Sequence, residues 1–398
     1  MTVMQEGAAG QELAFERPVE RSLVHRRAVT EVYVTDTRPV SGIRFAVAAQ
    51  LPRSHRYFTD HTGYAAPDRL DRGGRTAPAG ATGAAGPAET TGPDGDGGGR
   101  PAAARTTATA GGSAAPADGF AADPLLLTEC CRQAATTVAH RYLGVPPDTA
   151  FLVTRWTARF TAAAPQPPGG GPDELTLLVG ATDLRERGGR LESATLDVDL
   201  ALNGTPAGHA TIGAAYMPSG RYAALRALRR TTPPPLTSAL PPRAGGTVAA
   251  PGAVGRSLPE NVVLTDATPT PDGATARLDV PAGHPAIYDH PLDHVPAMGL
   301  IEAARQAALY TASRGERALL PQVAGFDAEF GRFAELDAPT TVTARRRGPV
   351  AGPPAGHTVA VDFRQLDTVI CAITVTLADT GHRPGTRDGA EARRGARR

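Results

Sequence analysis

Two stretches of the chain carry apolar residues around most of a helical circumference. They read LLLTECCRQAATTVAHRYLG from Leu125 and MGLIEAARQAALYTA from Met298. A helix with this pattern is buried on nearly all sides. Runs rich in Val, Ile, Tyr and Phe, bounded by turn residues, predict strands between Ser22 and Leu51 and at 151–160, 174–183, 193–203 and 207–216.

The sequence contains an internal repeat. EVYVTD from Glu31 matches NVVLTD from Asn261, and HRYFTDH from His55 matches HPAIYDH from His284. Both predicted helices contain Glu-x-x-Arg-Gln-Ala, and WTARF at 156–160 matches FDAEF at 326–330. Four blocks in the same order are an unlikely coincidence, so the chain is predicted to hold two copies of one structural unit.

Each copy reads strand, strand, long buried helix, and then three or four strands. An antiparallel sheet that curls around one central helix satisfies this order, which is the hot-dog fold. The predicted class is therefore α+β, a tandem (double) hot-dog. The two copies would pair as an internal pseudo-dimer, so a monomeric chain would be sufficient. A two-domain α+β protein with helices packed flat on separate sheets is the alternative.

Composition sets the predicted boundaries, because the 45 Gly and 37 Pro are clustered rather than spread. Residues 1–20 are predicted to be a disordered N-terminus and 21–222 the first repeat. That repeat is interrupted at 62–119 by a low-complexity insertion that cannot bury enough apolar surface to order itself. A Pro/Gly linker at 231–256, the second repeat at 257–380 and a flexible basic tail at 381–398 complete the chain.

Charge and composition exclude several classes of protein. A formal net charge of +1 argues against a general nucleic-acid binder. No apolar stretch approaches the roughly 18 residues of a membrane span, and the N-terminus lacks a signal-peptide pattern. Cys130, Cys131 and Cys371 form neither a disulfide framework nor a metal-ligand pattern. The sequence therefore predicts a cytoplasmic protein without metal or other cofactor.

The predicted helices keep ionisable side chains where burial makes them costly unless they are paired. Spacings of three and four residues place a Glu, an Arg and a Gln on one face of each helix. These residues are Glu129, Arg132 and Gln133 in the first copy and Glu302, Arg305 and Gln306 in the second. A Glu–Arg pair three residues apart is most often a structural ion pair, and its duplication is compatible with either role.

A histidine follows an aspartate upstream of each helix, as Asp60-His61 and Asp289-His290. Only a short turn separates His290 from the second helix, so His290 and Glu302 are expected to converge there as an acid/base pair. The N–H groups of the helix N-terminus could polarise a thioester carbonyl. Cys130 and Cys131 could suggest a nucleophile, but the second copy has alanines there, which favours core packing.

The segment HPLDHVPAMGLIEAARQA from His290 resembles the His-to-Glu segment of hot-dog β-hydroxyacyl-thioester dehydratases. The resemblance implies catalytic roles for His290 and Glu302, with Ala297 and Met298 in the Pro-Gly context of that family. Ala297 replaces the family's Gly. Two departures argue against dehydration: the His-to-Glu distance is about two residues shorter, and Arg305 replaces a small residue.

A closer resemblance spans roughly Leu23–Phe160 and Arg256–Thr380. The tandem layout, both Glu-x-x-Arg-Gln-Ala helices, VHRRAVTEVYVTD and DHPLDHVPAMGLIEAARQA are similar to the A-factor biosynthesis (AfsA-type) hot-dog family. The resemblance implies transfer of a β-ketoacyl group from an acyl carrier protein or acyl-CoA thioester to dihydroxyacetone phosphate. That reaction begins the synthesis of γ-butyrolactone signals that control antibiotic production.

The same resemblance implies that the Glu, Arg and Gln of both helices form the active site. With the residues of the His loops and of the second helix start, the predicted catalytic residues are Glu302, Arg305, His290, Glu129 and Arg132, and the predicted substrate contacts are Gln133, Gln306, His61, Ala297 and Met298. Arg305 is expected to bind the acceptor's phosphate, because guanidinium matches phosphate geometry better than ammonium does. Two other functions stay open: a dehydratase or thioesterase, and a non-catalytic regulator that binds an acyl or lactone ligand. The absence of an evident helix-turn-helix weakens the regulator hypothesis.

Overall fold

The computed structural model describes residues 12–60, 122–161, 171–228, 230–315, 320–350 and 356–378, which all belong to one compact unit. The predicted insertion at 62–119 lies wholly outside these residues. His61, the first eleven residues and the predicted basic tail at 381–398 also lie outside the described residues.

The first repeat supplies two strands, a helix and four further strands. They are β1 (Val34–Ser41), β2 (Arg44–Leu51), α1 (Pro124–Arg141), β3 (Thr149–Phe160), β4 (Asp173–Arg187), β5 (Arg190–Leu202) and β6 (Thr205–Pro218). The predicted strands and helix agree with these bounds to within a few residues. Residues before β1 instead form two short 3-10 turns, η1 (Arg21–Val24) and η2 (Val29–Glu31).

The second repeat has the same order of elements. It contains β7 (Leu264–Thr270), β8 (Gly273–Leu278), α3 (Ala297–Ser313), β10 (Gln322–Phe330), β12 (Thr341–Val350), β13 (Gly356–Gln365) and β14 (Thr368–Ala378). A small ribbon joins β9 (His294–Val295) to β11 (Ala334–Glu335). The helix α2 (Ser219–Ala227) and the turns η3 (Thr237–Ala239), η4 (Pro251–Ala253) and η5 (Pro259–Asn261) lie between β6 and β7.

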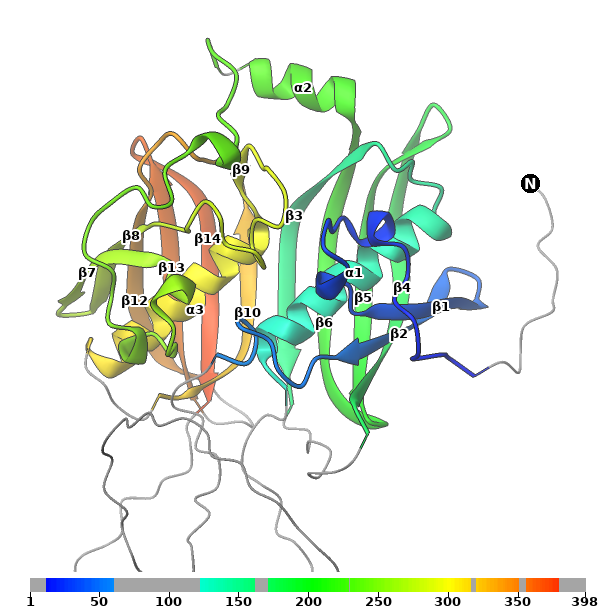
Figure 1. The fold of residues 1–398 in the computed structure, drawn as a ribbon, viewed down its shortest axis with the longest axis horizontal. Coiled ribbons are helices and arrows are strands. Elements are labelled where there is room, and N and C mark those ends of the chain that lie inside the picture. Colours follow the sequence, from blue (N-terminus) through cyan, green and yellow to red (C-terminus); the bar gives the residue numbers. More distant parts are fainter. Residues whose placement is uncertain are drawn as a thin grey trace, which may run out of the picture. The chain divides into compact units, whose positions relative to one another are not determined.

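The strands of both repeats form one antiparallel sheet of twelve strands (Figure 1). Its order is β1-β2-β4-β5-β6-β3 for the first repeat, followed by β10-β14-β13-β12-β8-β7 for the second. The second half is the reverse of the first, strand for strand. At the junction of β3 and β10, Thr157 lies opposite Asp327, its own counterpart in the repeat. A local pseudo-twofold axis therefore passes through this pair, and the chain is an internal pseudo-dimer.

Each central helix is enclosed as its apolar circumference predicts. Figure 1 shows α1 against the half-sheet of the first repeat and α3 against that of the second. Nearly all residues of both helices are buried, including the polar Thr128, Thr137 and Thr311. The predicted tandem hot-dog is therefore confirmed. The alternative with two separate sheets is wrong, because β3 and β10 join the repeats into one sheet.

Two predicted boundaries differ from the structure. Residues 12–20, expected to be disordered, run beside β1, where the N–H of Val19 donates to the carbonyl of Val34 at 2.9 Å. The second half of the predicted linker 231–256 does the same for β7: the N–H of Ala249 donates to Leu264 O at 3.0 Å. Small residues and glycines permit this close approach, so the second repeat begins before residue 257.

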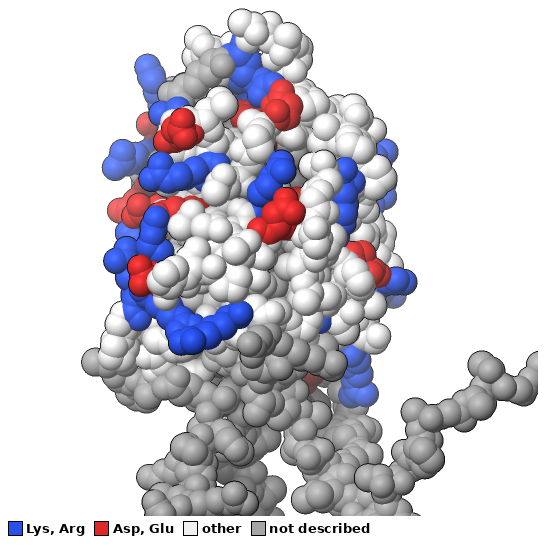
Figure 2. Space-filling model, turned by 90° about the vertical axis from the view of Figure 1, so that its left-hand side faces the viewer, with Lys and Arg blue, Asp and Glu red and all other residues white. Residues whose placement is uncertain are grey.

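The outer face of the second repeat carries charges of both signs. Figure 2 shows arginine side chains with Asp and Glu between many of them. Between β12 and β13, Arg345 and Asp362 form an ion pair at 3.0 Å, with both side chains accessible to solvent. Exposed pairs of this kind contribute little to stability. Among the described residues, no helix combines the length and apolar character required to cross a bilayer.

Candidate active site

Two equivalent polar clusters lie on the buried faces of the central helices. The first cluster is Arg26, Glu129, Arg132 and Gln133, and the second cluster is Arg256, Glu302, Arg305 and Gln306. In each cluster, the spacing of three residues along the helix places the predicted Arg in contact with the predicted Glu. Arg132 Nε donates to Glu129 Oε2 at 2.8 Å, and Arg305 Nε donates to Glu302 Oε2 at 2.6 Å. The structure thus brings together the helical residues that the repeat predicted.

The glutamine side chains Gln133 and Gln306 hydrogen-bond the central helices to the backbone just before the first strand of each repeat. The amide of Gln306 donates to Asn261 O at 2.8 Å and accepts from the N–H of Val263 at 2.9 Å. Its second N–H donates to Glu302. Gln133 makes the same three kinds of contact in the first repeat. Because these hydrogen-bonding groups are occupied, the geometry favours a structural role over the predicted contact with substrate.

Each cluster contains a second arginine that the sequence did not predict. Arg26 contacts Glu129 at 2.8 Å, and Arg256 contacts Glu302 at 2.7 Å. Both come from the turns before β1 and β7, far in sequence from the helices. A signal was present, since Arg26 and Arg256 are separated by the same 230 residues as Glu31 and Asn261. Arg256 was assigned to the linker instead.

Each cluster is completed by a loop from the other repeat. Arg26 Nη1 donates to Ala286 O at 3.0 Å, and Arg256 Nη1 donates to Tyr57 O at 2.5 Å. Tyr57 and Ala286 are counterparts in the repeated His loops. Both sites are therefore composite, and a motif read within one copy cannot identify its partners.

Because the His loops cross between the repeats, His290 does not lie where the sequence predicts. Its Nδ1 is hydrogen-bonded to the side chain of Asp289. The Asp289 carboxylate accepts from the N–H of Arg27 at 2.6 Å and lies 3.7 Å from Arg26. His290 is therefore near the first cluster. Within the described residues, no hydrogen bond or ion pair joins His290 to Glu302. The prediction that these two residues converge is therefore corrected, because each His loop crosses to the cluster of the other repeat.

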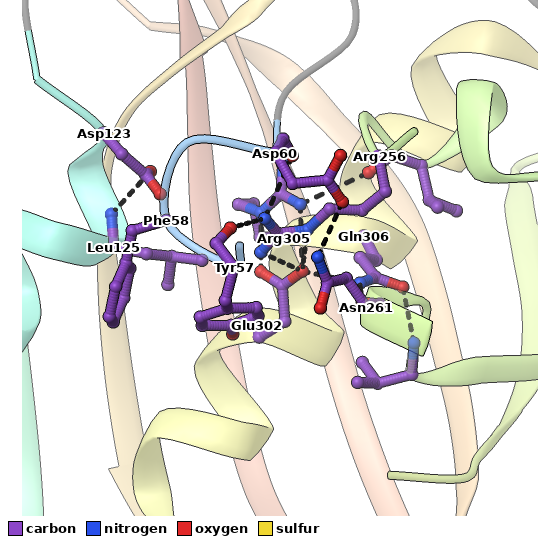
Figure 3. A network of polar contacts seen from close by, with 12 residues as sticks. Tyr57, Phe58, Asp60, Asp123, Leu125, Arg256, Asn261, Glu302, Arg305 and Gln306 are labelled. Carbon is purple, nitrogen blue, oxygen red and sulfur yellow. Dashed lines mark hydrogen bonds and ion pairs between the residues drawn. The ribbon is translucent and has the colours of Figure 1, made fainter. Parts of the chain in front are cut away.

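The second cluster is closed (Figure 3). The ring of Tyr57 covers Arg256, with 4.4 Å between the guanidinium carbon and the ring centroid. The Arg256 side chain is 0% exposed and that of Arg305 is 3% exposed. Cation–π contact and burial together give this cluster the character of a core ion-pair network.

The first cluster is open at one point. Ala286 stands at the position of Tyr57, and Arg26 remains buried, with 6% of its side chain exposed. Every residue of α1 from Pro124 to Ala139 is buried except Arg132, whose side chain is 21% exposed. A partly exposed arginine that is held by a buried carboxylate can bind an anion.

Histidines border this open side. His25 has a left-handed backbone, with φ 51°, and its Nε2 lies 2.8 Å from Nε2 of His140. Gly255 is the counterpart of His25. Burial, and then Arg132, His140 and His290, lower the pKa of His25 to about 3. His25 is therefore neutral near pH 7, and the charges that act on it come from the open side of the first cluster.

The sequence matches the family model described as the A-factor biosynthesis hotdog domain at residues 8–68, 114–218 and 241–380, well over half of the chain. The chain belongs to the A-factor biosynthesis hotdog family. The membership predicted from the sequence is therefore confirmed.

Curated relatives of this A-factor family chain carry the name 2-oxo-3-(phosphooxy)propyl 3-oxoalkanoate synthase. One from Streptomyces virginiae is 32% identical and covers 94% of this chain and 99% of its own length. One from Streptomyces coelicolor is 30% identical and covers 84% of each chain. The crystal structure of a putative oleoyl thioesterase from Lactobacillus plantarum has a TM-score of 0.36 and 14% identity, over 64% of this chain and 86% of its own.

The buried carboxylates of this A-factor family chain are poorly suited to proton transfer. Burial alone would raise the pKa of Glu129, but Arg132 and Arg26 outweigh it and lower the pKa to about 2. Arg256 and Arg305 lower the pKa of Glu302 to about 2 in the same way. A carboxylate with a lowered pKa is a weak base, and each of these glutamates contacts two guanidinium groups.

The remaining predicted residues are placed as follows. Ala297 is the first residue of α3, and Met298 after it is buried. The carbonyl of Pro296 accepts from the N–H of Gly299 at 2.9 Å. Cys130, Cys131 and Cys371 are buried free thiols, and burial raises the pKa of each. A raised pKa suppresses the thiolate, which agrees with their predicted role in core packing.

Proposed function

We propose that this chain transfers a β-ketoacyl group from a thioester to the hydroxyl of dihydroxyacetone phosphate, and that the first cluster is where the transfer occurs. The name shared by the synthase relatives describes the ester that this reaction would form. One observation carries the assignment to the first cluster. Arg132 is a fixed guanidinium with access to solvent, and its counterpart Arg305 is enclosed.

The reaction needs a cation for the acceptor's phosphate. Arg132 supplies it: Glu129 holds its Nε and Nη2, and Nη2 also donates to Val24 O at 3.0 Å, so Nη1 of this partly exposed side chain is the nitrogen offered to an anion. The sequence predicts this role for Arg305. Burial opposes that assignment, because a phosphate at Arg305 would first have to displace the packing around α3.

The reaction also needs a base for the acceptor's hydroxyl. The hydroxyl oxygen attacks the thioester carbonyl, the C–O bond forms, the C–S bond breaks, and the proton passes to the base and then to the departing thiolate. The glutamates are too weakly basic for this step, so an imidazole takes the proton. His290 is the candidate, as the sequence already predicted, although it acts with Arg132 rather than with Glu302.

The wider assignment follows from this reaction. The donor is an acyl carrier protein or acyl-CoA thioester, the product begins γ-butyrolactone synthesis, and the reaction takes place in the cytoplasm. The family membership and the names of the synthase relatives support the product in this assignment.

The test is to incubate purified protein with a β-ketoacyl carrier thioester, with and without dihydroxyacetone phosphate, and to analyse products by mass spectrometry. The phosphorylated ester should form only when both substrates are present. Release of free β-keto acid at the same rate in both reactions would identify a thioesterase instead. Turnover of a β-hydroxyacyl thioester to its enoyl product would identify a dehydratase, and a bound but unchanged thioester would indicate a regulator.

A further inference from the structure

The contacts of His290 define its tautomer. His290 Nδ1 lies 2.5 Å from Asp289 Oδ1. Burial alone would raise the pKa of Asp289, but His290, the N–H of Arg27 and Arg26 outweigh it and lower the pKa to about 2. An ionised carboxylate only accepts hydrogen bonds, so Nδ1 of His290 carries the proton. In the neutral ring, Nε2 is then the basic nitrogen, on a side chain that is 38% exposed.

Asp289 itself is held rigidly. Its side chain is 2% exposed, and its Oδ2 accepts from the N–H of Arg27 at 2.6 Å. Arg27 belongs to the first repeat and Asp289 to the second. The carboxylate that orients His290 is therefore fixed by the same turn that delivers Arg26 to Glu129.

The counterpart aspartate of the other loop is used differently. Asp60 accepts from Nδ2 of Asn261 at 2.7 Å, from the N–H of Ser257 at 3.0 Å, and from the Ser257 hydroxyl. Where the second repeat has Asn261, the first has Glu31, which has no proton to donate as a carboxylate and instead contacts His55 at 3.0 Å. This substitution leaves one oxygen of Asp289 available to His290.

From this asymmetry we infer that Asp289 is a positioning residue for His290, and that the pair is contributed by the second repeat to a working site built on Arg132 of the first. The inference rests on the proposed function. Asp289 keeps the proton on Nδ1, so that Nε2 takes the proton from the acceptor's hydroxyl, and it stabilises the imidazolium that results. The proton then leaves from Nε2 to the thiolate, and the pair returns to its starting state.

A purely structural role for Asp289 is the competing explanation, since it also connects the repeats through Arg27. Asp289→Asn separates the two roles. The amide oxygen can still accept from Arg27, but the amide N–H groups facing His290 favour the tautomer with the proton on Nε2. We expect kcat for acyl transfer to fall about 100-fold or more, with KM for dihydroxyacetone phosphate nearly unchanged.

Two comparisons make the test specific. Asp60→Asn, at the pseudo-symmetric position, should keep kcat per folded molecule even where it lowers the melting temperature. In a His290→Ala background, Asp289→Asn should cause no further loss of kcat. Equal losses in Asp60→Asn and Asp289→Asn, or an additive loss in the double variant, would overturn the positioning role.

The ring tautomer can be measured without any turnover. In protein labelled with ¹⁵N-histidine, the His290 signals, assigned by their loss in His290→Ala, should report a protonated Nδ1 in the native chain and a protonated Nε2 in Asp289→Asn. The same tautomer in both proteins would contradict the inference. Because this readout requires no substrate, failure of the acyl transfer assay alone would count against the proposed function and not against the orientation of His290.

Discussion

The two clusters share a Glu, two Arg and a Gln in the same arrangement, yet one is open and the other is closed. The ring of Tyr57 covers Arg256, and its counterpart in the other loop is Ala286, but Arg26 is itself only 6% exposed. Arg132 reaches solvent, and Arg305 does not. We therefore propose that the duplicated polar motif serves structure in the second repeat and chemistry in the first, and that access to solvent distinguishes the two.

The largest expected effect is on the stability of the closed cluster. Glu302→Ala would remove the buried carboxylate that contacts both Arg256 and Arg305, which should reduce the free energy of unfolding by about 3–5 kcal/mol. Chemical denaturation measures it. The control is Glu192→Ala, which removes an exposed pair with Arg221 and should change stability by less than about 1 kcal/mol. A loss below 1 kcal/mol for Glu302→Ala would show that the second cluster is not a core network.

The next effect is on activity at the open cluster. Arg132→Ala should reduce kcat/KM for dihydroxyacetone phosphate by about 100- to 1000-fold, because a charge-assisted contact to phosphate is lost. The unphosphorylated acceptor dihydroxyacetone should show a much smaller loss. Arg305→Ala is the matched control, in which the protein that remains folded should keep its turnover. A larger loss of kcat/KM in Arg305→Ala than in Arg132→Ala would show that the reaction occurs at the second cluster, as the sequence predicts.

The buried glutamates also predict a dependence of stability on pH. The folded-state pKa of Glu302 is about 2, below its ordinary value of 4.5. Its contribution, about 3 kcal/mol, is therefore complete above pH 4.5 and is lost as pH falls towards 2. Denaturation between pH 6 and 3 should show a shallower slope for Glu302→Gln than for the native chain. An identical slope in the two proteins would mean that Glu302 does not titrate with folding.

The smallest expected effect concerns the backbone next to each second arginine. Gly255 has φ 73°, and an added Cβ would lie 2.8 Å from Cδ1 of Leu309. Gly255→Ala should cost about 1–2 kcal/mol, whereas His25→Gly, at the equivalent left-handed position, should change stability by less than about 1 kcal/mol. Thermal melts of the two variants provide the comparison. A tolerated Gly255→Ala would indicate that the closed cluster has more room than the structure shows.

The sequence allowed the repeat, the enclosed helices and the helical Glu–Arg pairs to be predicted, because each depends on local periodicity or on spacing along one helix. Arg26 and Arg256 were missed, since they reach the helices through tertiary contacts from distant turns. The pairing of His290 with Glu302 was wrong for a related reason. The His loops cross between repeats, and spacing within one copy contains no information about that exchange. Burial likewise separated Arg132 from Arg305, which the sequence makes equivalent.

The central claim is that the reaction occurs at the open cluster of the first repeat. A crystal structure of the protein with dihydroxyacetone phosphate tests it most directly. The account predicts that phosphate oxygens lie within hydrogen-bond distance of the Arg132 guanidinium, with the hydroxyl towards His290. A phosphate bound at Arg305, with the first cluster empty, would contradict it.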